Sequence, residues 1–285
     1  MSRPVVTRRR EVSHTSARSL LMTVLGEYVL PRGRPVWTSV LVDTLAAFGI
    51  EEKSARQALA RTAAEGWLVS DRVGRRVRWS LTPPGTKLLT EGAKRIYEFG
   101  SVQRPWDGQW LVLLASVPES KRDLRHRLRT RLTWAGFGSP EAGVWICPDP
   151  GRQQEAGQIL QSLGLGQDAM SFVAQYGTIG EVGSMVARAW DLSEVETRYE
   201  EFIAEFGAMQ PGNGRPTLHA QTMLVHEWRR FPFLDPGLPL DLLPPNWRGV
   251  QAAELFHTKH LEWRPAAQQH WDIMGGGDSS GDQAG

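Results

Sequence analysis

Apolar positions in the first part of the chain recur at helical spacing. Residues 19–31 predict one helix, in which the inward positions are Leu20, Leu21, Val24, Leu25, Tyr28 and Val29. A second helix is expected to begin at Thr38 or Ser39, since either hydroxyl can cap it, and to end at Gly49. Trp37 precedes this cap in the position of a hydrophobic staple.

Residues 50–67 predict a third helix with one apolar and one polar face. With Leu59 at the centre of the buried face, a rotation of 100° per residue brings four others to the same side: Ala55, Thr62, Ala63 and Gly66. The outward side then carries Lys53, Ser54, Gln57 and Arg61, with Arg56 at its margin. Amide and basic side chains of this kind contact phosphates and base edges in the major groove of DNA.

Two short alternating runs, residues 67–69 and 77–81, predict the strands of a hairpin. Gly74 is placed to supply a positive φ at its turn. The basic residues of this hairpin are Arg72, Arg75, Arg76 and Arg78. A further helix is expected from Thr82 or Pro83 to about Phe99.

Three helices followed by a hairpin are the element order of a winged helix-turn-helix, which we place at residues 19–100. The third helix would read a groove, and the hairpin would be the wing. Charge supports this interpretation: residues 1–99 hold 17 Lys and Arg against 9 Asp and Glu, a net +8, whereas the remaining residues hold 16 against 22, a net −6. A solvated basic face without a partner, or a winged helix that docks on proteins, remains the alternative.

Residues 105–182 alternate between strand and helix patterns. The expected order is a strand at 110–120, a helix within 121–140, a strand at 143–150, a helix near 154–163 and a strand at 171–179. This β-α-β-α-β order suggests a small α+β sandwich of ferredoxin-like type.

Helix patterns dominate residues 184–265, which we expect to form a C-terminal helical domain. Helices are expected at 184–207, 219–230 and 250–263, and a proline-rich segment at 231–249 that cannot be regular helix. Residues 1–18 are expected to be a basic disordered arm and residues 272–285 a disordered tail.

Composition is that of an ordinary globular protein, with 41% hydrophobic and 22% charged residues among 285. No apolar run approaches the roughly 20 residues that span a bilayer, and no secretory signal precedes the first helix. The single cysteine, Cys147, excludes an internal disulfide framework and fits a reducing compartment. We therefore expect a cytoplasmic protein with no membrane contact.

Four blocks of sequence stand out along the chain: EGWLVSDRVGRRVRWSLTPPG at 65–85, PWDGQWLVLL at 105–114, LTWAGFGSP at 132–140 and HEWRRFPFLDPGLPLDLLPPNWRG at 226–249. Together these blocks resemble the PaaX family, the repressors of phenylacetic acid degradation operons. The resemblance implies a winged helix, a central ferredoxin-like domain similar to Cas2 proteins, and a helical C-terminal domain. It also implies a homodimer that binds operator DNA and is released by an aryl-CoA thioester, typically phenylacetyl-CoA.

A Cas2-like domain raises the alternative of a metal-dependent nuclease, which would need an aspartate at the end of the first strand. Ser116 and Val117 occupy that region here, and Glu119 follows a proline. Without a pair of acidic ligands a Mg²⁺ site is poorly supported. We therefore expect no enzyme.

The spacing of the histidines and the position of the cysteine favour neither a metal site nor a nucleophile. His257 and His260 form an H-x-x-H, and His219 and His226 are seven residues apart, but no third and fourth ligands have metal-site spacing. Cys147 lies on an apolar strand, where a buried inert thiol is expected. The sequence predicts neither a metal nor a cofactor.

Arginines at positions 122–131 allow two interpretations. They can form a solvated helix face, or they can contact the phosphates of a CoA thioester or of additional DNA, with Arg125 and Arg129 as the candidates. Trp228 and Trp247 are candidates for an aromatic acyl pocket. The function expected from the sequence is a dimeric DNA-binding repressor controlled by an acyl-CoA, with a Cas2-like nuclease and a protein-interaction scaffold as alternatives.

Overall fold

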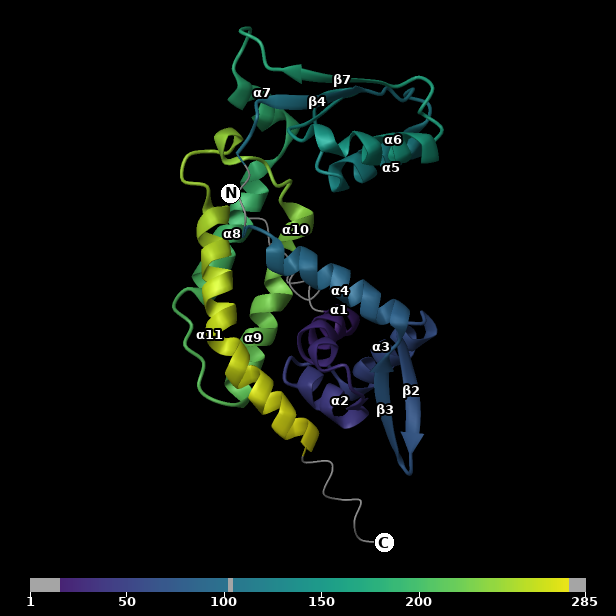
Figure 1. Cartoon of the computed structure of the whole chain (residues 1–285), viewed down its shortest axis with the longest axis vertical. Coiled ribbons are helices and arrows are strands. Elements are labelled where there is room, and N and C mark those ends of the chain that lie inside the picture. Colours follow the sequence, from purple (N-terminus) through teal and green to yellow (C-terminus); the bar gives the residue numbers. More distant parts are fainter. Residues whose placement is uncertain (1–15, 102–104, 277–285) are drawn as a thin grey trace, which may run out of the picture. The chain divides into compact units, whose positions relative to one another are not determined.

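The computed structural model describes residues 16–101 and 105–276, which form two compact units (Figure 1). Of these described residues, the first unit contains 16–98, 208–229 and 255–276, and the second contains 99–101, 105–207 and 230–254. The C-terminal helical segments are thus shared between the two units. Most of the expected basic arm and of the expected tail lies outside the described residues.

The first helix of unit 1 begins two residues earlier than predicted. α1 (Ala17–Val24) starts after Ser16, whose hydroxyl accepts a hydrogen bond from the Ser19 amide at 3.1 Å and so caps the helix. Ala17 is therefore helical and not part of a disordered arm. The helix continues as a π-helical turn, η1 (Leu25–Val29), and a 3-10 turn, η2 (Leu30–Arg32), and then stops at Gly33 with φ of 59°.

The predicted order of three helices and a hairpin is confirmed. The elements are α2 (Thr38–Ala46), α3 (Glu52–Ala64), β2 (Leu68–Val73), β3 (Arg76–Leu81) and α4 (Pro83–Glu98). One strand is additional: β1 (Val36–Trp37) pairs antiparallel with β3, which gives the sheet order β1-β3-β2. Trp37 therefore belongs to a strand as well as preceding a helix.

Distant segments complete the core of unit 1. Two C-terminal helices, α9 (Arg215–Trp228) and α11 (Arg248–Gly276), bury side chains among those of α1, α2 and α3. These side chains are Leu218 from α9 and Ala267 and Trp271 from α11. The Trp271 ring stacks on Tyr28 with centroids 4.8 Å apart. The last helix runs 13 residues past its expected end because these contacts offset the hydrogen bond lost at Pro265.

A buried carboxylate lies at the meeting point of these segments. The side chain of Glu27 is 2% exposed, and it accepts hydrogen bonds from Gln221 Nε2 at 2.9 Å and from the Tyr97 hydroxyl. His260 Nε2 lies 3.4 Å from Glu27 Oε1, and Arg264 Nε lies 3.9 Å from it. α4, α9 and α11 thus all supply partners to one carboxylate of the π-helical turn.

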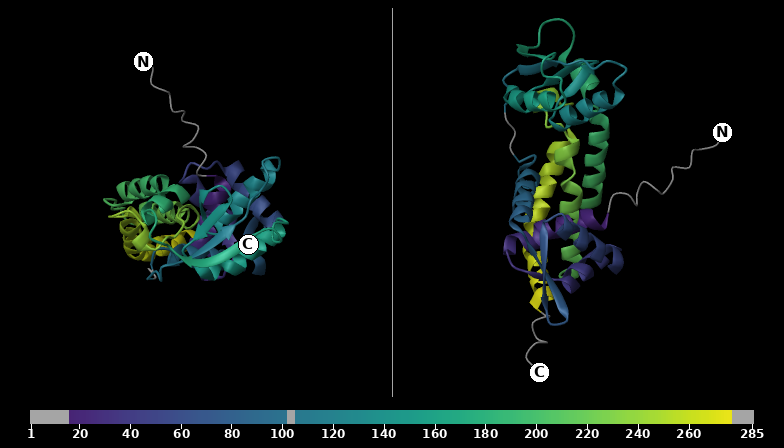
Figure 2. Two further views of the ribbon diagram at one scale, coloured as in Figure 1. Left: turned by 90° about the horizontal axis from the view of Figure 1, so that it is seen from above. Right: turned by 90° about the vertical axis from the view of Figure 1, so that its right-hand side faces the viewer.

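Unit 2 contains a four-stranded antiparallel sheet of ferredoxin-like topology. Its strands are β4 (Gln109–Leu114), β5 (Gly138–Glu141), β6 (Val144–Cys147) and β7 (Met170–Gln175), in the order β5-β6-β4-β7. α5 (Arg122–Trp134), the turn η3 (Pro150–Arg152) and α6 (Gln153–Ser162) complete the β-α-β-β-α-β order. Figures 1 and 2 show α5 and α6 against one face of this sheet.

The predicted β-α-β-α-β order lacked one strand. Residues 138–140 belong to the segment predicted as helix, but α5 ends at Trp134 because Gly136 takes a φ of 82° and closes it. Gly138 then permits close packing, since a Cβ there would lie 2.5 Å from the Trp190 ring. Gly136 therefore ends α5, and Gly138 begins β5.

The remaining segments of unit 2 pack around aromatic side chains. The helix expected at 184–207 is broken at Trp190, which is extended and separates α7 (Val182–Ala189) from α8 (Leu192–Phe206). The proline-rich segment contains only α10 (Phe231–Leu234) and the 3-10 turn η4 (Leu240–Leu242). Tyr199 stacks on Phe231 with centroids 4.2 Å apart, and its hydroxyl donates to the half-buried Asp235 at 2.6 Å.

We predict that Glu27→Gln lowers the free energy of unfolding by about 3 kcal/mol, because it removes the charge from a buried and partnered carboxylate. Burial alone would raise the pKa of Glu27, but His260, Tyr97 and Gln221 outweigh it and hold this pKa below its ordinary value of 4.5. The stabilisation is therefore present above pH 4.5 and is lost as pH falls through the lower folded-state pKa.

Urea unfolding at a series of pH values measures this effect. Glu91→Gln is the matched control, because Glu91 is 67% exposed and pairs only with Lys87 on the same helix; its effect should stay within about 0.5 kcal/mol. A Glu27→Gln variant as stable as the control variant at pH 7 would show that the charge of Glu27 does not stabilise the fold.

Candidate nucleic-acid interface

α3 has the two faces that its sequence predicts. Its buried residues are Ala55, Ala58, Leu59 and Thr62, and its exposed basic and amide residues are Lys53, Arg56, Gln57 and Arg61. Ser54 is half-buried. Ala63 is half-buried, and Gly66 is exposed because the helix has ended before it and its φ is 79°. Gly66 therefore does not belong to the buried face.

Short contacts between neighbours organise the exposed side of α3 without burying it. Arg56 pairs with Glu52 at 2.7 Å, and Arg61 Nη2 donates to Gln57 Oε1 at 3.4 Å. Among the residues that the structure describes, Lys53 has no ion-pair partner. A shallow hollow of about 600 Å³ along the helix is lined by Glu52, Lys53, Arg56, Gln57 and Ala60. Exposed ion pairs of this kind are weak, so Arg56 can exchange its carboxylate for a phosphate.

The predicted wing is a regular hairpin, and its tip carries Arg75. Gly74 takes a φ of 60°, which confirms the conformation predicted for the turn. Arg75 is exposed, and it has no hydrogen-bond or ion-pair partner within residues 16–101 and 105–276. Arg72 is also exposed, and its Nε donates to the carbonyl oxygen of Gly74 at 3.2 Å.

The other two wing arginines are held by neighbours. Arg78 pairs with Asp71 across the hairpin at 2.6 Å. The guanidinium of Arg76 lies 4.1 Å from the centre of the Trp37 ring, as a cation–π contact. Both side chains are half-buried. Each arginine of the hairpin carries the same positive charge, but Arg76 and Arg78 are held by neighbouring side chains and Arg75 is not.

Thr38 fixes the wing to α2. Its hydroxyl donates to the carbonyl oxygen of Val77 at 2.9 Å and accepts from the indole of Trp79 at 2.9 Å. Gly85 lets α4 approach the start of the wing, since a Cβ there would lie 2.1 Å from the carbonyl oxygen of Trp67. Sequence reasoning assigned Thr38 only a capping role, because the strand that brings it to the wing is two residues long.

Three family models match the chain in sequence order. They are described as a PaaX-like protein at residues 16–85, the PaaX protein central Cas2-like domain at 103–186 and the PaaX-like protein C-terminal domain at 190–273. The Transcriptional repressor PaaX of Escherichia coli (strain K12) is 30% identical over an alignment of 263 residues, and this alignment covers 88% of this chain and 82% of that protein. This chain belongs to the PaaX family.

The resemblance noted in the sequence is thus confirmed, and so is the Cas2-like assignment of the central domain in this PaaX-family chain. A solved structure, the uncharacterized protein Rv0674 from Mycobacterium tuberculosis, matches with a TM-score of 0.57. It covers 95% of this chain and 99% of its own, at 20% identity. That similarity concerns the fold alone.

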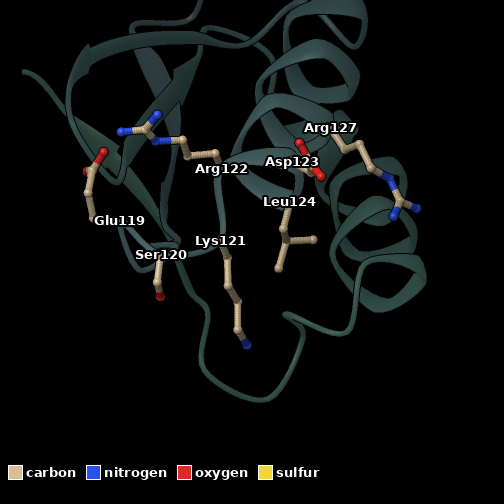
Figure 3. Close-up of a pocket in the computed structure, with 7 residues that line it drawn as sticks. All are labelled: Glu119, Ser120, Lys121, Arg122, Asp123, Leu124 and Arg127. Atoms are coloured by element: carbon tan, nitrogen blue, oxygen red, sulfur yellow. The ribbon is translucent and has the colours of Figure 1, made fainter.

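In the Cas2-like domain of this PaaX-family chain, the predicted effector arginines lie on α5. Arg125 is half-buried and pairs with Glu119 at 2.8 Å, and Arg129 is exposed. The Glu119 side chain holds the pKa of Arg125 above its ordinary value. Close by is a shallow hollow of about 650 Å³, shown in Figure 3, whose basic lining residues are Lys121, Arg122 and Arg127.

The two predicted acyl-pocket tryptophans belong to different units. Trp228, in unit 1, is fully buried; its indole donates to the carbonyl oxygen of Ile96 at 3.1 Å and its ring stacks on Phe256. Trp247, in unit 2, is 6% exposed and packs edge-on against Tyr199. Both have the contacts of core residues, and their role in ligand binding stays a prediction.

The cysteine and the histidines considered in the sequence analysis have surroundings typical of structural residues. Burial raises the pKa of the Cys147 thiol to about 11, so this thiol is not a nucleophile at neutral pH. His226 is buried, and its Nδ1 lies 2.9 Å from the Thr23 hydroxyl. His219 stacks on Phe48, and His260 contacts Glu27. Within the described part of the chain, no three His, Cys, Asp or Glu side chains are grouped as metal ligands.

Among the described residues, no helix is long and apolar enough to cross a membrane.

Proposed function

We propose that this PaaX-family chain is a transcriptional repressor that binds operator DNA as a homodimer and is released by an aryl-CoA thioester such as phenylacetyl-CoA. The observation that carries this proposal is the exposed amide and basic face of α3 beside a wing whose tip carries Arg75, an arginine with no partner among the described residues. The printed name of the relative from Escherichia coli, a transcriptional repressor, supports the same role.

In the proposed complex, α3 enters the major groove. The Gln57 amide can pair with the edge of an adenine, and Arg61 with that of a guanine. Lys53, Ser54 and Arg56 stand at the helix start, where side chains reach bases or the flanking phosphates. Glu51 and Glu52 favour this helix terminus but oppose phosphate approach, so the basic residues must outweigh them locally.

The wing contributes affinity without sequence preference. Arg75, and Arg72 beside it, are free to reach phosphates next to the groove. The guanidinium groups of Arg76 and Arg78 already contact Trp37 and Asp71, so a phosphate would have to compete with these contacts. The net +8 of residues 1–99 supplies the long-range attraction on which this contact depends.

A homodimer would present two such surfaces related by a two-fold axis. Its operator would then be an inverted repeat whose half-sites are spaced by the distance between the two α3 helices. We infer that the effector is anionic, because CoA carries phosphates and α5 presents arginines beside a hollow. Arg125 and Arg129 are the residues proposed to contact those phosphates.

We predict that the double variant Arg75→Ala, Arg76→Ala binds all duplexes more weakly, with the slope of log K against log salt concentration reduced by about 2. Gln57→Ala should instead change the preferred base at one position of each half-site, at a cost of about 1–3 kcal/mol. Selection from a random duplex library, followed by titrations at several salt concentrations, measures both effects.

The matched control for these variants is Arg198→Ala, which removes an arginine of unit 2 that pairs with Glu201 on its own helix. It should bind as the parent does. If the wing and Gln57 variants also bind like the parent, the groove assignment is wrong. If the parent retains no duplex at low salt, the chain is better explained as a protein-interaction module.

A separate prediction concerns release. With phenylacetyl-CoA added, the parent should lose its operator, whereas Arg125→Ala, Arg129→Ala should need about tenfold more thioester for the same loss. Operator affinity without thioester should be unchanged, because these residues are outside the wing and α3. Gel shifts with a panel of CoA thioesters test this, and equal release of parent and variant would remove α5 from the effector site.

A further inference from the structure

Unit 1 contains a second, more enclosed hollow, on the side of the wing sheet that meets the end of α11. Its volume is about 360 Å³, and its lining includes Arg32, Arg34, Val36, Trp37, Trp271 and Asp272. The chain segments involved are the turn after α1, the strand β1 and the last turns of α11. Its volume is at the low end of the ~300–1,000 Å³ typical of small-molecule sites, so a fitting ligand is small.

Two arginines in this hollow already hold a carboxylate. Arg32 donates to Asp272 through Nε to Oδ1 at 2.7 Å and through Nη2 to Oδ2 at 2.9 Å. Arg34 Nη2 donates to the same Oδ1 at 2.9 Å. This is the bidentate geometry with which guanidinium groups recognise carboxylates and phosphates.

The guanidinium of Arg32 is fixed before any ligand arrives. It donates to the carbonyl oxygens of Tyr28 and Gln268, each at 2.9 Å, and its side chain is only 14% exposed. Asp272, by contrast, is 47% exposed and lies near the end of a helix. The donor is therefore rigid, whereas its present acceptor can be exchanged for another anion.

The remaining walls are aromatic and apolar. Trp37 and Trp271 contribute indole rings, and Val36 is buried beside them. The charged groups in the lining are two arginines and one aspartate, so the hollow has a net charge of +1 and favours an anion over a cation. Flat apolar groups pack well against indole rings.

We propose that this hollow binds a small ligand with a flat apolar group and one acidic group, whose carboxylate or phosphate takes the place of Asp272 on Arg32 and Arg34. Its size and position distinguish it from the α5 hollow proposed for a CoA thioester. Trp37 also carries the Arg76 guanidinium, so the site lies directly beside the wing.

Binding of benzoate and of phenyl phosphate to the full chain, followed by saturation-transfer NMR and calorimetry without DNA, tests the proposal. Benzamide has the ring but not the charge, whereas acetate and inorganic phosphate have the charge but not the ring. Benzoate or phenyl phosphate should saturate, and all three comparison compounds should bind at least about tenfold more weakly, because each lacks half of the recognised chemistry.

Two variants separate a ligand site from a merely structural ion pair. Arg34→Ala should weaken binding about tenfold, and Asp272→Asn should tighten it about tenfold, since the competing carboxylate has become a neutral amide. Lys87→Ala, at a 78% exposed position on α4, is the control and should bind like the parent. Circular dichroism establishes that each variant is folded; Arg34 is 66% exposed, so its removal leaves the fold intact.

The proposal is overturned if the two aryl acids bind no better than benzamide, or if Asp272→Asn weakens their binding instead of tightening it. If Asp272→Asn does not fold, the Arg34→Ala variant decides the question, and equal binding of the aryl acids by this variant and the parent would overturn the proposal. Because these titrations contain no DNA, their failure would leave the proposed repressor function untouched, and a failure to bind operator would leave this site untouched.

Discussion

The packing of unit 1 depends on the buried carboxylate of Glu27 and its partners. It is reached by donors and cations from α4, α9 and α11, which are far apart in the sequence. A carboxylate with so little exposure must be partnered, and each partner is therefore constrained in position. Residues 19–100 alone would lack Gln221 and His260, and they would also lose the stacking of Trp271 on Tyr28. The winged helix is thus completed by the C-terminal helices.

The polar face of α3 follows from how its other face is buried. Ala55 and Ala58 are small enough for close packing, so Leu59 alone supplies most of the apolar volume. The long polar side chains of α3 all lie on its exposed side. The wing has a similar division, because Thr38 and Trp79 fix it to α2 while Gly74 and Arg75 form its exposed tip. A rigid support with unpaired charge at its edge is suited to a partner of high negative charge.

Local patterns were enough to predict most elements, but not the contacts between distant segments. The period of 3.6 residues identified α1, α2 and α3, and the alternation at 67–81 identified the wing. Strands β1 and β5 were missed because two and four residues are too short for a period, and Gly138 does not favour a strand. The break at Trp190 was missed because the apolar spacing continues through it. Glu27 was not selected at all, since a lone acid on an apolar stripe gives no sign of partners 194 and 233 residues away.

We propose that α3 and the β2–β3 wing together form the surface that binds duplex DNA. Hydrogen–deuterium exchange of the full chain, with and without a duplex selected from a random library, tests this proposal most directly. Exchange should be slower at residues 52–64 and 72–77 when duplex is bound, with the β4–β7 sheet unchanged. Retention of duplex with unchanged exchange at residues 52–77 would contradict it.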